Sequence, residues 1–403
     1  MFSVIAINYM DRVNFAVSTP AIRKTYGFSL EQIGAILFAW SIVYAVFNVP
    51  GGMLIDRIGL RYGLVLALGW WSCFTIATPF ARSLGQWYAV RGLMGAGEAS
   101  IWPLNAKAAH AWATPNRRSL FFTWAGSGQF VGPFIGNALA GLILVRYGWQ
   151  STFVIFGVLG LLVLPLWLVT VRERPHERGP RERADWPAVR AVFFSRTGVG
   201  MLLVYLTFGY ILFTFLNWVP SYMYYTFHMS ILKSALWASA AAGFGWLGFI
   251  LSGPLNDWLV TAFDRLTARR IGAATPMLGT IACMAASLHS ARAGDAVTTA
   301  VLLGVAQLLM NLTVGAWAVN VIDISPNEAS TGLVYGIYNG VLNLMGAFNS
   351  LILTAIAAHR GFPLAFGSAI VFMLVFIASM LFVIDRPSYN RLVAASYSED
   401  KRP

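Results

Sequence analysis

Five charged side chains lie inside long apolar stretches of this 403-residue sequence. They are Asp11, Arg12, Arg91, Glu98 and Lys107. If the stretches cross a bilayer, a charge near the middle costs at least about 2.5–3.5 kcal/mol, so such residues usually face a polar cavity and pair with one another. A buried carboxylic acid beside an arginine can bind and release a proton near neutral pH, because burial favours the neutral acid and the arginine favours the carboxylate. An arginine stays charged, but its planar fork suits a carboxylate ligand.

The spacing of these residues allows both functional and structural roles. Arg91 and Glu98 are seven residues apart, so they share one face of a helix. They can serve proton coupling or form an ion pair that holds two helices together. Asp11 has the same two alternatives, and Arg12 is either a substrate anchor or the structural partner of Asp11. Lys107 lies at the end of its stretch and is expected to extend to the membrane surface.

The composition excludes a water-soluble protein. Charged residues make up 11% of the chain and hydrophobic residues 58%, with a mean hydropathy of +0.65. Soluble domains are about one quarter charged, so the chain is predicted to be an integral membrane protein with many helices. The net charge of +12 does not predict nucleic-acid binding, because the densest basic stretch, Arg172 to Arg196, also carries acidic residues and separates two hydrophobic blocks.

Metal, disulfide and enzyme chemistry have little support in the sequence. Cys73 and Cys283 both lie in apolar runs, which predicts neither a disulfide framework nor a thiol cluster. The five histidines have no second metal-type ligand at a suitable spacing, so no metal site is expected. No phosphate-binding loop and no Ser-His-Asp order indicates an enzyme. The only expected cofactor-like species is a coupling proton.

A transmembrane helix needs about 20 mostly apolar residues, and the chain contains twelve such stretches. They are roughly 1–22, 32–55, 62–81, 84–106, 119–145, 151–171, 197–222, 233–259, 271–290, 295–322, 332–358 and 363–384. The first stretch begins at Met1 without a preceding charge, so some native N-terminus is expected to be missing.

The loop charges predict the orientation and the domains. If the central basic loop and the C-terminal tail are cytoplasmic, that side holds 18 loop lysines and arginines and the other side holds 7. Proline and charge make the central loop a linker. The predicted parts are an N-terminal six-helix bundle 1–171, a cytoplasmic linker 172–196, a C-terminal six-helix bundle 197–384 and a cytoplasmic tail 385–403.

The two halves repeat weakly, and one loop carries a motif. Gly52 to Asp56 at the end of the second stretch is matched by Gly253 to Asp257 at the end of the eighth, 201 residues later. The loop motif consists of Gly52, Asp56, Arg57, Gly59 and Arg61, with Tyr62 at the last basic position. This pattern resembles the loop motif of the major facilitator superfamily. The resemblance implies two pseudo-symmetric bundles and a gate built on this loop.

Further segments resemble the anion:cation symporter family, which includes proton-coupled galactonate, glucarate, hexuronate and tartrate carriers. The segments are Asn8-Tyr9-Met10-Asp11-Arg12-Val13-Asn14, Arg91 to Pro103, Tyr44, Ser127 to Gly132, Trp317, Asp323-Ile-Ser-Pro326 and Tyr338-Asn339. The resemblance implies substrate contacts from five residues besides Arg12. They are Tyr9, Tyr44, Gln129, Trp317 and Asn339. One departure is Gly315-Ala316 before the tryptophan, where sugar-acid carriers often have hydroxyl residues; this predicts a roomier, less polar pocket.

These observations and resemblances predict a proton-coupled symporter that carries a small organic anion into the cell by alternating access. Asp11, Glu98 and Arg91 are the expected coupling residues, and a sugar acid is the favoured substrate. The expected location is the inner membrane of a bacterium, as a multi-pass monomer in contact with lipid. Alternatives are a proton antiporter that exports drugs or metabolites, an aromatic-acid symporter, and a non-transporting sensor. Gly132-Pro133 is a faint sign of the antiporter, but it is better explained as a helix kink and packing site.

Overall fold

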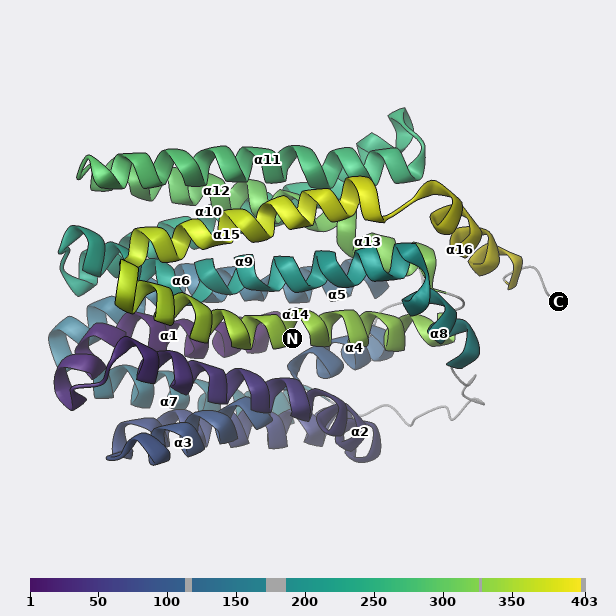
Figure 1. Cartoon of the computed structure of the whole chain (residues 1–403). Coiled ribbons are helices and arrows are strands. Elements are labelled where there is room, and N and C mark those ends of the chain that lie inside the picture. The colour runs from purple at the N-terminus through teal and green to yellow at the C-terminus, as the bar shows by residue number, and fades with distance from the viewer. Residues whose placement is uncertain (113–117, 172–185, 326–327, 400–403) are drawn as a thin grey trace. The chain divides into compact units, whose positions relative to one another are not determined.

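The computed structural model describes residues 1–112, 118–171, 186–325 and 328–399, and every regular element in these ranges is helical (Figure 1). The helices up to residue 170 are α1 (Phe2–Tyr26), α2 (Leu30–Ala77), the 3₁₀ turn η1 (Thr78–Phe80), α3 (Leu84–Glu98), α4 (Ile101–Trp112), α5 (Arg118–Gly126), α6 (Gly128–Tyr147) and α7 (Trp149–Thr170). The later ones are α8 (Trp186–Phe194), α9 (Arg196–Phe227), α10 (Ile231–Ala262), α11 (Arg265–Arg292), α12 (Ala296–Leu312), α13 (Val314–Ile324), α14 (Glu328–Arg360), α15 (Phe362–Ala378), the π turn η3 (Ser379–Val383) and α16 (Arg386–Glu399).

The predicted apolar stretches coincide with these helices. Within the described ranges, ten helical segments are long and apolar enough to cross a membrane. The two predicted stretches outside this set, 1–22 and 84–106, fall on α1 and on α3 with α4. These helices carry the intramembrane charges, which lower their hydropathy. The prediction of an all-helical integral membrane protein is confirmed, and the count of twelve crossings stays a prediction.

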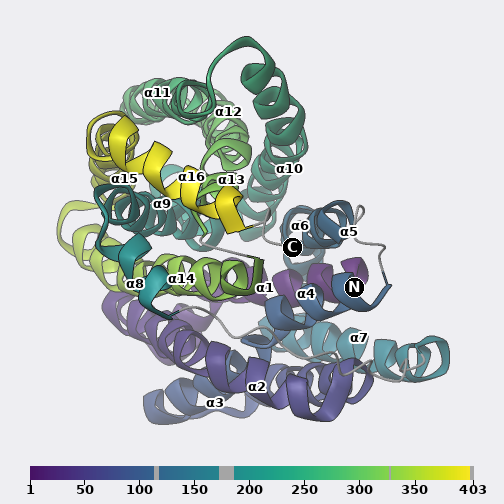
Figure 2. The ribbon, with the colours of Figure 1, turned by 90° about the vertical axis from the view of Figure 1, so that its right-hand side faces the viewer.

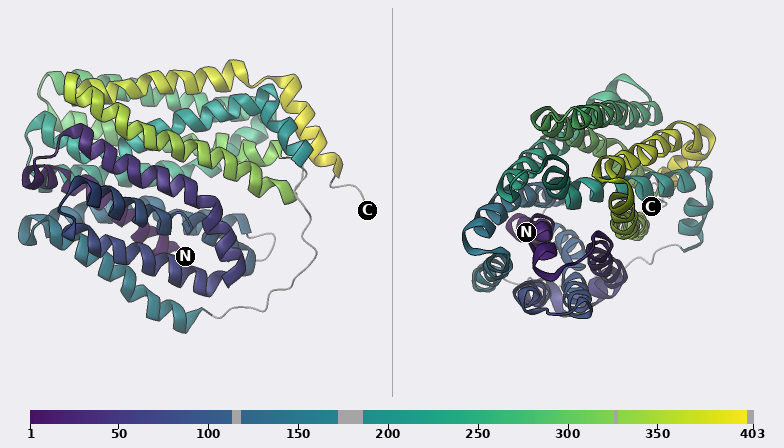
Figure 3. Two further views of the ribbon diagram at one scale, coloured as in Figure 1. Left: turned by 60° about the horizontal axis from the view of Figure 1, so that its bottom comes forward. Right: turned by 60° about the vertical axis from the view of Figure 1, so that its left-hand side comes forward.

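Helix α2 contains two predicted stretches and a sharp break between them. A straight helix of its 48 residues would be about 72 Å long, more than twice the roughly 30 Å of a bilayer core. The break falls at Gly59, whose φ of 87° favours glycine, and the ribbon turns back there (Figure 3). After the turn, the Arg61 side chain donates to the Leu168 carbonyl at 2.7 Å, and the Trp167 indole donates to the Arg61 carbonyl at 3.1 Å. The loop motif therefore forms a turn that is tied to α7.

Side-chain caps define several other helix ends. Ser29 with Gln32 and Ser83 with Gln86 form capping boxes that begin α2 and α3. Asp264 caps α11 by accepting a hydrogen bond from the Thr267 backbone amide. These caps satisfy backbone N–H groups at the helix ends, so each chain reversal is encoded locally.

The chain forms two compact units. The first comprises 1–175, 213–243 and 347–365, and the second comprises 176–212, 244–346 and 366–403. In the first unit α1 packs against α6 and α7, and α2 packs against α3 and α7. In the second unit α11 packs against α12 and α13. The units cut across the predicted bundles, because the adjoining ends of α9 and α10 and of α14 and α15 belong to the first unit; the division by sequence stays a prediction.

Helices α2 and α3 approach closely at Gly95. A Cβ atom at this position would lie 2.5 Å from the Trp40 carbonyl oxygen and 3.2 Å from the Trp40 Cδ1 atom. Gly85, on the same helix, has open space where its Cβ would be. The glycine at position 95 therefore sets the distance between the two helices, and it lies three residues before Glu98.

We predict that Gly95→Ala lowers the free energy of unfolding by about 1–3 kcal/mol, because the methyl group would overlap a backbone atom that cannot move alone. Gly85→Ala is the matched control and should be neutral or slightly stabilising. Unfolding of the purified proteins in detergent measures both. Equal stability of the two variants would show that the helices separate at little cost.

Candidate functional site

Four of the five charged residues singled out in the sequence come from two helices of the first unit. Asp11 and Arg12 lie in α1, and Arg91 and Glu98 lie in α3. All four are buried, with exposed fractions between 0% and 5%. Two acids and two arginines balance one another when all are ionised, which is the way a low-dielectric interior tolerates charge.

The hydrogen-bonded ion pair of this cluster joins Arg12 to Glu98. The Arg12 Nε atom donates to Glu98 Oε2 at 3.0 Å, and the two side chains are 4% and 0% exposed. One expectation from the sequence is that Arg12 is the structural partner of its neighbour Asp11. In the structure, Arg12 instead forms its hydrogen bond with Glu98. Adjacent residues of a helix point in different directions, whereas a residue on a second helix can face Arg12 directly.

Three aromatic rings surround the Arg12 guanidinium. Its Cζ atom lies 4.4 Å from the ring centre of Tyr9, 4.7 Å from that of Trp40 and 4.8 Å from that of Tyr44. Trp40 and Tyr44 are one helical turn apart on α2, and their rings stack with centres 5.3 Å apart. We call these rings the aromatic cage. Cation–π contacts of this kind contribute roughly 0.5–2 kcal/mol each, so the cage stabilises the guanidinium charge in addition to the hydrogen bond with Glu98.

Trp40 is a contact that the sequence analysis missed. It carries no charge and matches no motif, so nothing in its type distinguishes it from the other tryptophans. The available signal was its spacing, because a residue four positions before Tyr44 shares the same helix face. The close packing at Gly95 then places its backbone against α3.

Asp11 and Arg91 lie beside this pair but are held differently. Asp11 interacts electrostatically with Glu98 and Arg91. Arg91 places Nη1 at 3.0 Å from the Met94 sulfur, a weak acceptor, and its guanidinium lies 4.8 Å from the Phe15 ring centre. The hydrogen-bonded partner of Glu98 is Arg12, and the coupling role of Arg91 stays a prediction.

Several polar atoms of the cluster are buried without a hydrogen-bond partner among the described residues. They are both Asp11 carboxylate oxygens, Arg12 Nη2, Glu98 Oε1, the Tyr44 hydroxyl, the Trp40 indole nitrogen and both side-chain polar atoms of Asn8. Buried polar groups are normally paired, and each unpaired one costs roughly 1–3 kcal/mol. The concentration of such atoms around two carboxylates and an arginine makes this cluster the candidate functional site.

The other predicted contacts are spread over both units. Gln129 is half-buried in the first turn of α6, whose Gly128 packs against α1. Trp317 is buried in α13; its indole donates to Thr313 at 3.1 Å, and its ring lies against Tyr205. Asn339 is half-buried in α14. The structure therefore gathers Tyr9, Arg12, Tyr44 and Glu98 at one place, while the joint role of the others stays a prediction.

The packing bears on two sequence interpretations. Gly315 lies directly against the Ser252 backbone, and a Cβ at Gly272 would lie 3.1 Å from that of Ala316. Both positions before Trp317 are thus helix contacts, so the expectation that they widen a pocket loses its support. Gly132 packs against the α1 backbone at Ala6, which agrees with its interpretation as a helix-packing site.

The gating residues of the loop motif are only partly described. Gly59 and Arg61 form the turn of α2, whereas the side chains of Asp56 and Arg57 and the contacts of Gly52 lie outside the described residues. The same holds for the linker up to residue 185.

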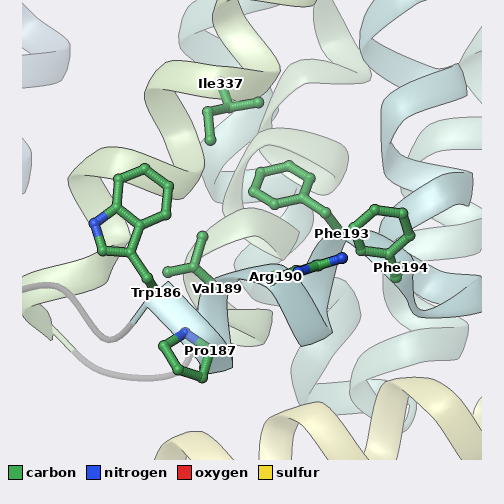
Figure 4. A pocket seen from close by; sticks show the side chains of 7 residues that line it. All are labelled: Trp186, Pro187, Val189, Arg190, Phe193, Phe194 and Ile337. Carbon is green, nitrogen blue, oxygen red and sulfur yellow. The ribbon is translucent and has the colours of Figure 1, made fainter.

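A groove of about 860 Å³ lies beside α8, and none of the predicted site residues lines it (Figure 4). Its lining residues are Trp186, Pro187, Val189, Arg190, Phe193, Phe194 and Ile337. Trp186 and Phe194 are 63% and 78% exposed, while Val189 and Val192 are buried. Helix α8 thus buries one face and exposes aromatic side chains on the other, as helices that lie on a membrane surface do.

Comparisons with known proteins agree with this architecture. Residues 1–348 match the model of the Major Facilitator Superfamily. The chain is 27% identical to a probable L-galactonate transporter of Escherichia coli over 87% of this chain and 80% of that protein. It is 27% identical to a hexuronate transporter of Bacillus subtilis over 96% of this chain and 95% of that protein. A bacterial homologue of the human lysosomal transporter Spinster, in an inward-facing and unoccupied conformation, superposes with a TM-score of 0.80 at 16% identity, over 97% of this chain and 96% of that chain.

The fold and the buried charge cluster define a multi-pass membrane transporter. The chain belongs to the Major Facilitator Superfamily. The predicted family is thereby confirmed, and the protein is a transporter rather than an enzyme.

We predict that Glu98→Gln lowers the free energy of unfolding by about 3–5 kcal/mol, because it leaves the Arg12 guanidinium buried without its partner. The double variant Arg12→Met/Glu98→Leu removes both charges, keeps Asp11 and Arg91 balanced, and should recover most of the loss. The exposed pair Arg386–Asp264, at 3.1 Å, is the control; Asp264→Asn should cost less than about 1 kcal/mol. Unfolding in detergent measures all of them. A double variant that is no more stable than Glu98→Gln would contradict the assignment.

Proposed function

We propose that this transporter carries a small organic anion, with sugar acids as the favoured class, into the cell together with protons. The observation that supports it best is the buried Arg12–Glu98 pair beside Asp11, with unpartnered polar atoms around it. An arginine in an aromatic cage is a permanent anion site, and two buried carboxylic acids are proton sites.

Charge balance couples the two ligands. When Asp11, Glu98, Arg12 and Arg91 are all ionised, the cluster is neutral and Arg12 is occupied by Glu98. Protonation of Glu98 removes the partner of Arg12 and leaves an excess positive charge, which an organic carboxylate then neutralises. Release of the anion restores the demand for a carboxylate at Arg12, so Glu98 loses its proton and pairs again. If more protons than negative charges move inward, the membrane potential adds about 2.3 kcal/mol per charge per 100 mV.

The proposed substrate class rests on the relatives and on the polar atoms of the site. The two relatives described above are named for galactonate and hexuronate. Tyr9, Tyr44 and Gln129 carry hydroxyl and amide groups that suit a polyol chain, and Trp317 and Asn339 are the proposed contacts from the later helices. An aromatic acid is the second candidate among substrates.

We further propose a location in a bacterial inner membrane as a monomer, with the central linker and the C-terminal tail in the cytoplasm. The excess of lysine and arginine in those loops supports this orientation. Reporter fusions at Gly179 and Tyr397 that show periplasmic activity would contradict it.

Proton coupling should depend on both acids. In proteoliposomes, Asp11→Asn and Glu98→Gln should each abolish uphill accumulation driven by a pH gradient, while at least one keeps counterflow exchange, because an amide mimics the protonated acid. Glu31→Gln, at an exposed glutamate near the start of α2, is the matched control and should accumulate normally. If both site variants still concentrate substrate, the coupling groups lie elsewhere.

Substrate class is tested with a panel of acids. Thermal shift of the purified protein and competition for uptake should single out hexonates, hexarates or hexuronates over benzoate and phthalate. The same sugar acid should fail to stabilise Arg12→Met, since the anion site is gone. Stabilisation by aromatic acids alone would reverse the order of the candidates, and export of labelled drugs in place of uptake would favour the antiporter.

A further inference from the structure

Helix α13 is a short, separate segment that carries Trp317. It follows α12 across Thr313, whose backbone is helical but where the bonds include the tighter three-residue spacing. This spacing makes Thr313 the irregular point between the two segments, and α13 has its own contacts at both ends. This matters for function because Trp317 is one of the proposed substrate contacts, so the inference below rests on that proposal.

The start of α13 is held by backbone packing. Gly315 lies against the Ser252 backbone of α10, leaving no room for a side chain, and Ala316 lies against Gly272 of α11. Trp317 itself packs against Tyr205 and Phe208, with ring centres 4.6 Å apart in each case. The backbone packing at Gly315 and Ala316 acts as a pivot, because it fixes one point of the helix, while the Trp317 ring and the far end are held by other contacts.

The far end of α13 is held by polar contacts. Asp323 accepts a hydrogen bond from Arg269 of α11 at 3.1 Å, and both side chains are largely buried. The Tyr389 hydroxyl lies 3.2 Å from the same Asp323 oxygen and 3.4 Å from the side-chain oxygen of Asn320. Asn320 and Asp323, one turn apart on α13, thus both lie within hydrogen-bond distance of the hydroxyl group of a residue on another helix.

Tyr389 comes from the tail helix α16, which packs against α13 (Figure 2). Only 2% of Tyr389 is exposed. Burial raises the pKa of its hydroxyl above the ordinary value, and the Asp323 carboxylate raises it further, so the group stays protonated and can donate. The tail has a second anchor that does not touch α13, because Arg386 donates to Asp264 and Thr267 of α11.

We propose that Tyr389 is a positioning residue, through which the tail helix α16 fixes the far end of α13 and thereby the position of Trp317 at the substrate. Asp323 and Tyr389 are at one end and Trp317 at the other, six residues or about 9 Å along the helix. A small tilt about the Gly315 pivot therefore moves the Trp317 side chain. Small displacements of binding groups have large effects on recognition and rate.

The test compares Tyr389→Phe, which keeps the ring and removes the hydroxyl, with Arg386→Ala, which loosens the tail without touching α13. Hydrogen exchange of residues 314–324 should rise in Tyr389→Phe and stay unchanged in Arg386→Ala. The KM for sugar-acid uptake should rise about 3–10-fold in Tyr389→Phe, whereas Arg386→Ala should stay within twofold of the parent. In a Trp317→Phe background, Tyr389→Phe should add no further increase, since both changes act on one contact.

The outcomes separate the inferred role of Tyr389 from the proposed role of Trp317 as a substrate contact. Unchanged exchange of α13 in Tyr389→Phe overturns the inference. Increased exchange with normal KM, while Trp317→Phe alone raises KM, also overturns it, because α13 would then move without affecting the substrate. If neither variant changes KM although exchange increases, the proposed role of Trp317 fails, and Tyr389 still holds α13.

Discussion

The central constraint in this protein is the cost of keeping charges in an apolar interior. Asp11, Arg12, Arg91 and Glu98 are almost completely buried, and the surroundings offer few polar partners. In a low dielectric an unpaired charge is costly, so the cluster is stable only while acids and arginines balance. Any change in one charge must be compensated by another. A proton and an organic anion are mobile charges of this kind, and the coupling proposed above uses them in that way.

The rest of the first unit supplies the geometry that this balance requires. Gly95 brings α2 against α3, while Trp40 of α2 and Glu98 of α3 both contact Arg12. Gly132 lets α6 reach α1 near Tyr9. Glycines at helix contacts therefore support the site even though they carry no chemistry, because the contacts of Arg12 need α1, α2 and α3 to approach within side-chain reach.

The second unit has an analogous arrangement with a different purpose. Arg269, Asp323 and Tyr389 form a partly buried polar cluster that joins α11, α13 and α16. Here the carboxylate is paired and hydrogen-bonded, which suits a group that stabilises a position. The two clusters differ in how their carboxylates are held. Glu98 Oε1 and both Asp11 oxygens have no hydrogen-bond partner among the described residues, whereas Asp323 Oδ2 lies within hydrogen-bond distance of both Arg269 and Tyr389.

Much of the protein could be predicted from the sequence because hydropathy and charge act locally. Apolar stretches of bilayer length, the basic linker and the isolated acids in α1 and α3 are properties of contiguous residues, and they determined the class, the family and the candidate residues. The sequence could not decide which arginine pairs with Glu98, since Arg91 shares its helix while Arg12 is 86 positions away. It also could not show Trp40 in the aromatic cage, or that Gly315 and Ala316 are helix contacts. Those facts depend on how separate helices pack, and close packing is set by side-chain shapes on both partners, so only the tertiary structure decided them.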